Sequence, residues 1–303
     1  MRALIIATLA AAAVAPMVIG AQLAPSRPLA EQIAHTDPGK YRASPAVHGG
    51  PGQLDYMSLF DHTSLDTNLF FLHRGVIQPK SGIGAHFHNQ CEEMFVILDG
   101  EAQFTIDGRT SVLKGPAGAP VRMGHSHAIY NHTDRPVEWM NINVSAVKAV
   151  YDAFDLGDPR VGVPLDPIPT FMTMRLDKAL LRPVEAMLGG KGAAQYRRAL
   201  SPSVFLGPWA YVDHVVLPPG ASVGPNTDPD FGAFYYVIDG SGRVTIGGEA
   251  AAITRGDAIP LRLKTAKTLE NTGTTPLELL VVGIASDPQK KIDLLPRRPP
   301  PRG

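Results

Sequence analysis

Cysteine is almost absent from this chain, and charge of either sign is not in excess. One cysteine among 303 residues excludes an internal disulfide framework. The 28 basic and 28 acidic side chains give a formal net charge of +0, so nothing indicates binding to nucleic acid or to an anionic membrane. Beyond the first residues, no apolar run is long enough to cross a bilayer, which excludes further membrane spans.

The first residues have the layout of a secretory signal peptide. They combine one arginine, an apolar run and small residues at Gly20 and Ala21. An uncleaved anchor is the alternative, which Pro16 and the many alanines disfavour. We therefore predict a signal peptide over residues 1–21, cleavage after Ala21, and a periplasmic or secreted mature protein without membrane contact.

Helical periodicity is scarce, whereas turn residues and short strand-like segments are frequent. The chain has 30 Gly, 28 Pro and 44% hydrophobic residues, which is typical of a turn-rich β protein. The best helical patterns lie within residues 176–200, where we expect short helices interrupted by Pro183. Segments of strand length and composition include FFLHRGVI, EMFVILDG, AQFTIDG, FYYVIDG and LELLVVGI.

Three histidines and one glutamate have the spacing of a metal site on strands. His86 and His88 alternate, so in an extended chain both side chains point to one face. Glu93 follows after a short turn, and His127 belongs to a later strand. Three imidazoles and one carboxylate suit a divalent first-row metal and leave positions open for substrate, water or dioxygen. The only cysteine, Cys91, lies in the turn, and we expect it to point away from the centre.

These motifs resemble those of the cupin superfamily. The first cupin motif has His-x-His, three or four residues, Glu, six residues and Gly. In this chain four residues separate His88 from Glu93, and six separate Glu93 from Gly100. The second motif, roughly Pro-x-Gly-x-x-His-x-x-x-Asn, matches Pro120, Gly124, His127 and Asn131, with two extra residues before Gly124. The leading Gly of the first motif is replaced by Lys80, which shifts a turn and leaves the ligands in place.

The second half repeats the first at an offset of 140 residues. Without a gap, Asp99 and Gly100 align with Asp239 and Gly240, and Asn131 aligns with Asn271. Fixed glycine, proline and asparagine positions indicate two copies of one fold, a bicupin. The second copy has lost every ligand, through the replacements of His86 by Asn226, His88 by Asp228, Glu93 by Ala233 and His127 by Lys267. Lys267 is either an anion contact in a repurposed pocket or part of a degenerate half kept for packing.

The resemblance implies an all-β protein made of two tandem cupin β-barrels of jelly-roll type, joined by a short, partly helical segment. Cupin relatives often pair through sheet edges, so a homodimer is an option. The predicted organisation is a signal peptide at 1–21, an extended segment at 22–52, a metal-binding barrel at 53–150, a linker with short helices at 151–202, a metal-free barrel at 203–288 and a disordered basic tail at 289–303.

By the same resemblance, one divalent transition metal would bind a small oxygenated substrate (a phenolic, a diketone or a sugar-derived acid) at the first barrel, and the first expectation is a dioxygenase. Iron or manganese is expected first, with zinc or nickel as options; iron favours a dioxygenase, and the other metals favour an isomerase, decarboxylase or lyase. A non-catalytic sugar- or metal-binding cupin is the rival reading. For acid–base catalysis the candidate is His125, in the turn before His127. The predicted substrate pocket comprises Phe95, Ile97, Phe104, Arg122 and Met123.

Overall fold

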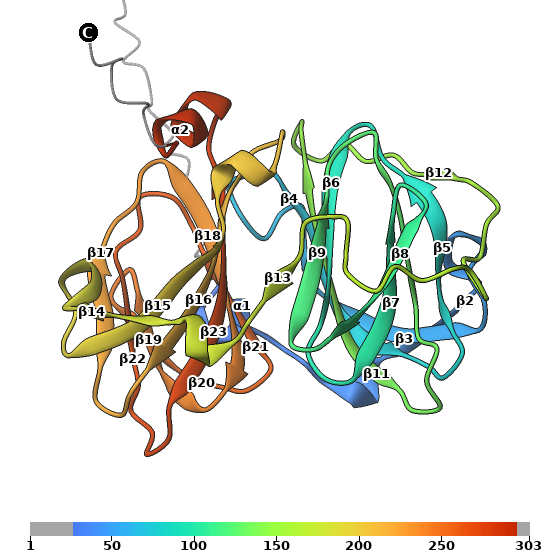
Figure 1. The fold of residues 1–303 in the computed structure, drawn as a ribbon. Coiled ribbons are helices and arrows are strands. Elements are labelled where there is room, and N and C mark those ends of the chain that lie inside the picture. Colours follow the sequence, from blue (N-terminus) through green and yellow to red (C-terminus); the bar gives the residue numbers. More distant parts are fainter. Residues whose placement is uncertain (1–26, 296–303) are drawn as a thin grey trace, which may run out of the picture.

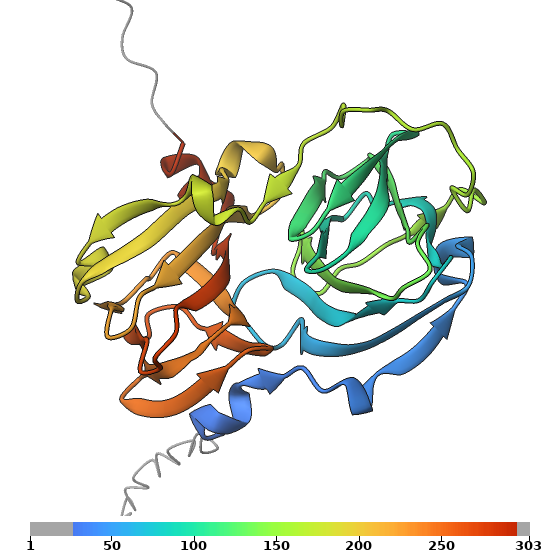
Figure 2. The ribbon, with the colours of Figure 1, turned by 60° about the horizontal axis from the view of Figure 1, so that its bottom comes forward.

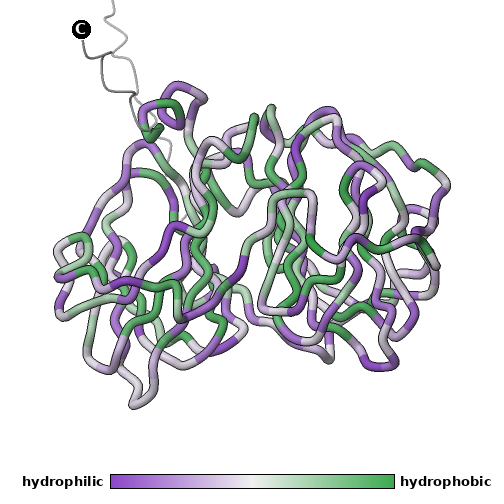
Figure 3. Tube along the Cα trace, viewed as in Figure 1, coloured by the Kyte–Doolittle hydropathy of each residue, from purple (hydrophilic) through white to green (hydrophobic). Residues whose placement is uncertain are grey.

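The computed structural model describes residues 27–295, which form two similar β-sandwiches side by side (Figure 1). The predicted signal peptide therefore lies outside the described residues. In Figure 3, hydrophobic residues follow the strands and hydrophilic residues gather in the outer loops. No helix in residues 27–295 has the length and apolar character needed to span a membrane.

The first domain places two antiparallel sheets face to face. No ladder of backbone hydrogen bonds joins the two sheets into a closed barrel, so the predicted jelly-roll barrel is an open sandwich of two sheets. In the order of pairing, the 7-stranded sheet contains β13 (Met174–Arg175), β9 (Ala117–Val121), β6 (Cys91–Ile97), β11 (Val137–Ser145), β4 (Leu69–Ile77), β3 (Gln53–Asp61) and β2 (Arg42–Pro45). The 5-stranded sheet contains β12 (Phe154–Asp155), β5 (Gly82–Phe87), β10 (Ser126–Tyr130), β7 (Glu101–Ile106) and β8 (Arg109–Lys114).

The second domain repeats this arrangement. Its 7-stranded sheet contains β1 (Ala34–His35), β21 (Asp257–Leu261), β18 (Phe231–Asp239), β23 (Leu277–Ala285), β16 (Trp209–Leu217), β15 (Ala193–Leu200) and β14 (Arg182–Glu185). Its 4-stranded sheet contains β17 (Ser222–Asn226), β22 (Lys267–Glu270), β19 (Ser241–Ile246) and β20 (Glu249–Thr254). Helices are few: α1 (Leu29–Gln32), α2 (Pro288–Asp293) and the 3-10 turns Pro38–Lys40, Val47–Gly49, Lys178–Leu180, Met187–Gly189 and Pro202–Val204.

The 140-residue offset holds in atomic detail. The Asn131 side chain donates to the carbonyl oxygens of Ile77 and Arg135, at 3.0 and 2.7 Å. Asn271 donates to the carbonyls of the residues 140 positions later, Leu217 and Thr275, at 2.7 and 2.8 Å. The asparagine of the second motif therefore fastens a turn to a neighbouring strand in both domains, which explains its place in the repeat.

The two domains exchange edge strands. The N-terminal segment places β1 against β21 of the second domain before it enters the first. The inter-domain segment places β13 against β9 of the first domain before it enters the second. Figure 2 shows the two crossing segments on opposite sides of the molecule, one blue and one yellow-green. Each crossing covers a sheet edge of the other domain, which blocks that edge from pairing with another chain.

The short helices expected within residues 176–200 are present only as the 3-10 turns Lys178–Leu180 and Met187–Gly189. The rest of this stretch, including most of the segment expected to form the second helix, forms β14 and β15, and β15 pairs with β16. The stretch as a whole repeats the turn–strand–turn–strand pattern of residues 38–61, so the domain copy begins well before the predicted boundary at 203. Helix propensity of Ala, Leu and Arg is a weak preference that pairing with β16 overrides. The predicted disordered tail also needs correction, because α2 occupies Pro288–Asp293 and Asp287 caps its N-terminus; residues 296–303 lie outside the described part.

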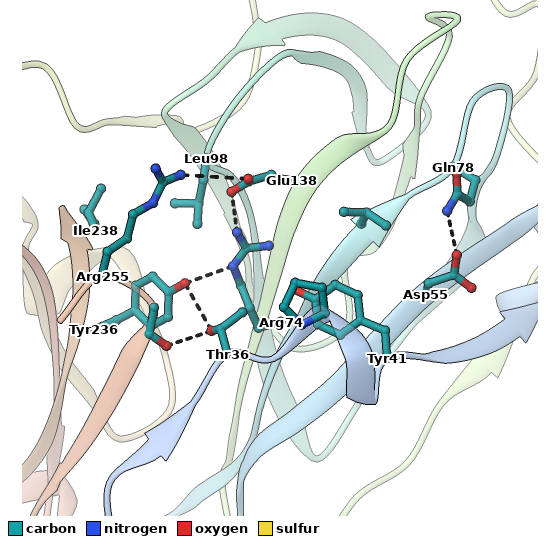
Figure 4. Close-up of a pocket in the computed structure, with 13 residues that line it drawn as sticks. Thr36, Tyr41, Asp55, Arg74, Gln78, Leu98, Glu138, Tyr236, Ile238 and Arg255 are labelled. Carbon is teal, nitrogen blue, oxygen red and sulfur yellow. Dashed lines mark hydrogen bonds and ion pairs between the residues drawn. The ribbon is translucent and has the colours of Figure 1, made fainter. Parts of the chain in front are cut away.

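The domains meet through a shared apolar core and a buried polar contact. Phe60 and Phe234, from different domains, pack edge to face at 6.1 Å. Figure 4 shows the cleft between the domains, where the Arg74 guanidinium donates to the Tyr236 hydroxyl at 2.9 Å and to the Glu138 carboxylate. The same guanidinium donates to the Trp139 carbonyl at 3.1 Å. All three nitrogens of the guanidinium therefore donate, and the bond to Tyr236 joins the two domains.

Removing the Arg74 side chain is expected to destabilise the contact between the domains. Arg74→Met leaves the Tyr236 hydroxyl and the Trp139 carbonyl without their donor, and we expect a loss of about 3 kcal/mol in the free energy of unfolding, measured in urea. The matched control is Arg243→Met, because Arg243 is half exposed and its pair with Glu270 spans 3.5 Å. That change should cost less than about 0.5 kcal/mol; equal losses would contradict the role of Arg74.

Candidate metal centre

Four side chains from both sheets of the first domain converge in its interior. His86 is on β5, His88 follows it, Glu93 is on β6 and His127 is on β10. The Glu93 Oε2 atom lies 3.7, 3.5 and 2.7 Å from the Nε2 atoms of His86, His88 and His127. All four side chains are at most 3% exposed. The register explains the meeting, because His86 is directly opposite His127 in the β5–β10 pair.

Backbone and side-chain partners orient these four groups. The Nδ1 atom of His86 faces the Gly84 carbonyl at 2.9 Å, and that of His88 faces the Asp152 carbonyl. With Nδ1–H donating to a carbonyl, Nε2 carries the free lone pair and points to the centre. On the far side of Glu93, its Oε1 atom accepts from the Asn141 and Asn143 amides at 3.0 and 3.3 Å. The Oε2 atom is left facing the imidazoles.

The donor set fits a divalent transition metal. One ligand atom from each of the four residues lies within 4.8 Å of the others. The Nε2 atom of His88 is buried without a hydrogen-bond partner, which is the state of a nitrogen prepared for a metal. Burial, reinforced by His86, lowers the pKa of His127 to about 3, so this imidazole is neutral. Burial raises the pKa of Glu93, but the imidazoles of His127, His86 and His88 around it outweigh this effect and hold that pKa well below its usual range. A neutral imidazole and an ionised carboxylate are the ligating forms.

A small cavity of about 100 Å³ adjoins the centre. His48 stacks on His86 with ring centroids 3.8 Å apart, and the Tyr151 ring lies 5.4 Å from that of His88. Gly84 permits the close approach of the 47–49 turn, since a Cβ there would lie 2.2 Å from the His48 carbonyl oxygen. The lining residues are Val47, His48, Leu54, Tyr56, Phe71, His73, Ile83, His86, Glu93, Phe95, Trp139, Asn141 and Tyr151.

Of the five predicted pocket residues, Phe95 is the one that lines this cavity. Ile97 and Phe104 pack deeper in the core of the first domain. Arg122 was expected at the mouth of the site, but its guanidinium donates to the carbonyls of Val204 and Ser203, at 2.5 and 2.9 Å. The loop that carries Arg122 lies where the two sandwiches pack together, so it faces the second domain. Met123, in the same loop, is partly exposed and does not line the cavity.

The predicted catalytic residue His125 is not at the centre. Its ring is about half exposed, and its Nδ1 atom lies 2.6 Å from the Asp107 carboxylate. The turn before β10 carries His125 to the surface, whereas the strand carries His127 inward. His125 is thus a polar turn residue, and it does not line the cavity beside the metal ligands.

Cys91 was expected to point away from the centre, and this was wrong. It is the first residue of β6, so it shares a face with Glu93 two positions later. The buried sulfur accepts a hydrogen bond from the Asn143 amide at 3.2 Å and lies close to His88 and Asp152. The sequence analysis placed Cys91 in the turn before Glu93, but strand β6 already begins at Cys91. The thiol therefore points to the same side as Glu93.

Residues His48, His73, Asn141, Asn143 and Tyr151 were missed by the sequence reasoning. A signal existed for the two asparagines, because they alternate within the apolar strand β11 and one face of that strand is therefore polar. His73 also lies within a strand-like run. For Tyr151 there was no local signal, since it reaches the site from a segment without regular structure.

His73 should make the stability of this protein depend on pH. Burial lowers its pKa from 6.5 to about 4. The unfolded chain therefore takes up this proton first as pH falls, and stability is lost between about pH 6.5 and pH 4. With screening by solvent at this partly buried ring, we expect about 2 kcal/mol from His73 between pH 7 and pH 4.5.

Urea unfolding at these two pH values compares the wild type with His73→Phe, which keeps a flat ring stacked on Phe71, 4.0 Å away. The variant should lose about 2 kcal/mol less than the wild type on acidification. An identical loss in both proteins would show that His73 does not carry this pH dependence.

The equivalent position in the second domain keeps the geometry and lacks the ligands. Asn226 is opposite Lys267 in the β17–β22 pair, as His86 is opposite His127. Ala233 on β18 replaces the glutamate. In the described part of the chain, both groups of possible metal ligands belong to the first domain.

Comparisons with known proteins agree with this architecture. The oxalate-binding protein of Thermotoga maritima is 30% identical over 113 residues, which cover 37% of this chain and 93% of that protein. The oxalate decarboxylase of Lactobacillus farciminis, solved with formate, has a TM-score of 0.60 at 14% identity, over 84% of this chain and 86% of that one. Salicylate 1,2-dioxygenase of Pseudaminobacter salicylatoxidans has a TM-score of 0.58 at 14% identity, over 76% of each chain.

These structural likenesses concern the fold, and they include proteins without a named activity. The coconut allergen cocosin has a TM-score of 0.61 at 10% identity and covers 84% of each chain. The family model described as the cupin domain matches twice, at residues 73–143 and 213–283, which are 140 residues apart like the repeat itself. The chain belongs to the cupin family, as a bicupin whose complete metal-ligand set lies in the first domain.

Proposed function

We propose that the first domain is a metal-dependent catalytic centre that cleaves a carbon–carbon bond of a small oxygenated acid. The observation that carries this proposal is the complete and buried set of three histidines and one glutamate beside a small cavity. A bound divalent metal would hold two neighbouring oxygens of the substrate and withdraw charge from them.

The size of the cavity favours a small acid over a phenolic compound. A volume of about 100 Å³ is smaller than the roughly 150 Å³ of an apolar cavity that holds benzene. An acid of two to four carbons fits this space, whereas an aromatic ring with substituents exceeds it. The Thermotoga maritima protein and the Lactobacillus farciminis decarboxylase, both named for oxalate, support the same size class.

The cavity walls provide orientation and exclude water. Phe95 and Trp139 form an apolar wall, which strengthens every electrostatic contact inside. Burial raises the pKa of Tyr151, so its hydroxyl remains protonated and can donate to a substrate oxygen. The neutral ring of His73 is the second polar group that can position a substrate or accept a proton.

The two leading chemistries differ in their use of oxygen. A dioxygenase consumes one dioxygen per turnover, whereas a decarboxylase releases carbon dioxide without net oxidation. The protein, loaded in turn with iron(II) and manganese(II), should be incubated with oxalate, malonate and pyruvate, and with catechol as an aromatic comparison. Oxygen uptake and carbon dioxide release are then recorded, with His86→Ala as the inactive control.

Turnover of one small acid that disappears in His86→Ala is the expected result. Faster turnover of catechol than of any small acid would contradict the size argument. Absence of turnover with each metal would contradict catalysis and favour the second candidate, binding without turnover. That candidate is supported by the Thermotoga maritima relative, which is named for binding oxalate.

With either function, we propose that residues 1–21 direct export to the periplasm or medium.

A further inference from the structure

The second domain contains its own cavity at the place equivalent to the metal centre. Its volume is about 310 Å³, about three times that beside the metal ligands. Apolar side chains make most of its wall, and the residues that replace the lost ligands line its polar end. These wall residues include Val215, Val223, Leu261, Leu269, Leu279 and Val281.

Lys267 provides a buried positive charge at this polar end. The residue is 8% exposed, and no carboxylate within residues 27–295 lies within 4.0 Å of its ammonium group. Burial lowers its pKa, which is the effect of removing an ammonium group from water. Such a charge is costly unless something pairs with it.

Asn226 provides a second group without a partner. Its Oδ1 atom is buried and accepts no hydrogen bond in the described part of the chain. Asn226 is the direct register partner of Lys267, so both side chains meet at one end of the cavity. Rotation of the amide offers either an N–H donor or an oxygen acceptor at this place.

The other charged groups on the cavity wall are already engaged. Arg198 donates to both oxygens of Asp213, at 2.9 and 3.3 Å. The Oδ1 atom of Asp228 accepts from the backbone N–H groups of Asp230 and Phe231, at 3.0 and 2.9 Å, and the charge of this carboxylate attracts the Lys267 ammonium without a direct ion pair. Lys267 is therefore the cation on this wall that remains available to a ligand.

We propose that the second domain binds the carboxylate of an apolar organic acid without a metal, with Lys267 as its counter-ion. In the first domain, the positive charge that receives an acid would come from the metal; in the second, it comes from the side chain that replaces His127. The larger apolar cavity accommodates a ring or a branched chain behind the carboxylate. This proposal does not depend on catalysis in the first domain.

Calorimetric titration with phenylacetate tests the proposal. The full chain carries His86→Ala and His88→Ala, which removes the first metal site as a competing acid-binding site. We expect saturable binding of phenylacetate, and binding at least about tenfold weaker for phenylacetamide, which has the same shape without the charge. Adding Lys267→Met should weaken phenylacetate binding by about tenfold or more.

The matched control is Lys264→Met, which removes an exposed lysine three residues away and should leave affinity unchanged. Unfolding in urea checks the fold, and Lys267→Met should be as stable as the parent or more stable, because an unpaired buried charge is removed. Lys267→Gln repeats the test with a polar side chain. No saturable binding of phenylacetate, equal binding of the amide, or unchanged affinity in both Lys267 variants would each overturn the proposal.

Discussion

His127→Ala is expected to abolish metal binding and turnover in the first domain. The side chain is fully buried and neutral, and its Nε2 atom lies 2.7 Å from the Glu93 carboxylate at the point where the ligands meet. Alanine removes one of the four donors. We expect metal affinity to fall by more than about 100-fold, since even outer partners of metal ligands are worth about 10- to 100-fold.

Metal content by elemental analysis is the direct measurement. The wild type should retain about one equivalent after dialysis, and His127→Ala close to none. The control is His125→Ala, two residues away, whose half-exposed ring pairs with Asp107. It should retain the metal and keep activity within about twofold, because it does not line the cavity. If both variants lost metal equally, a general weakening of the turn would explain the result, and the ligand assignment would be wrong.

The metal ligands could be predicted from the sequence because strands translate spacing into direction. Alternation places His86 and His88 on one face, and the second motif, with Pro120, Gly124 and Asn131 around it, identifies His127. The 140-residue offset similarly predicted the second domain and its lost ligands. In both cases, local geometry and a fixed register carry the information.

The surroundings of the site could not be predicted in this way. Arg122 faces the second domain, and only the packing of the two sandwiches determines that direction. Tyr151 enters from an irregular segment that no periodicity describes. Residues 193–200 contain good helix formers, yet they form strand β15 because an existing sheet offers them partners. Tertiary contacts decided each of these features.

Asn141 and Asn143 hold the glutamate ligand, and their loss is expected to weaken the metal centre without weakening the fold. Both amides donate to the Glu93 Oε1 atom, which directs Oε2 to the imidazoles. Both also have a buried Oδ1 atom without a hydrogen-bond partner, which is a cost in stability. Two buried amides with unpaired oxygen atoms would not be favoured by a purely structural role. We therefore infer that Asn141 and Asn143 orient the Glu93 carboxylate.

Leucine has nearly the same shape as asparagine and donates no hydrogen bond. Asn141→Leu should reduce metal affinity by about tenfold, and the double change with Asn143→Leu by up to about 100-fold, measured by competition with a chromophoric chelator. Asn143→Leu alone should have the smaller single effect, because its contact with Glu93 is longer, at 3.3 Å against 3.0 Å. Urea unfolding of the metal-free proteins should show unchanged or higher stability. A double variant that binds metal like the wild type would show that the carboxylate needs no support from β11, and a less stable one would assign the asparagines to the fold instead.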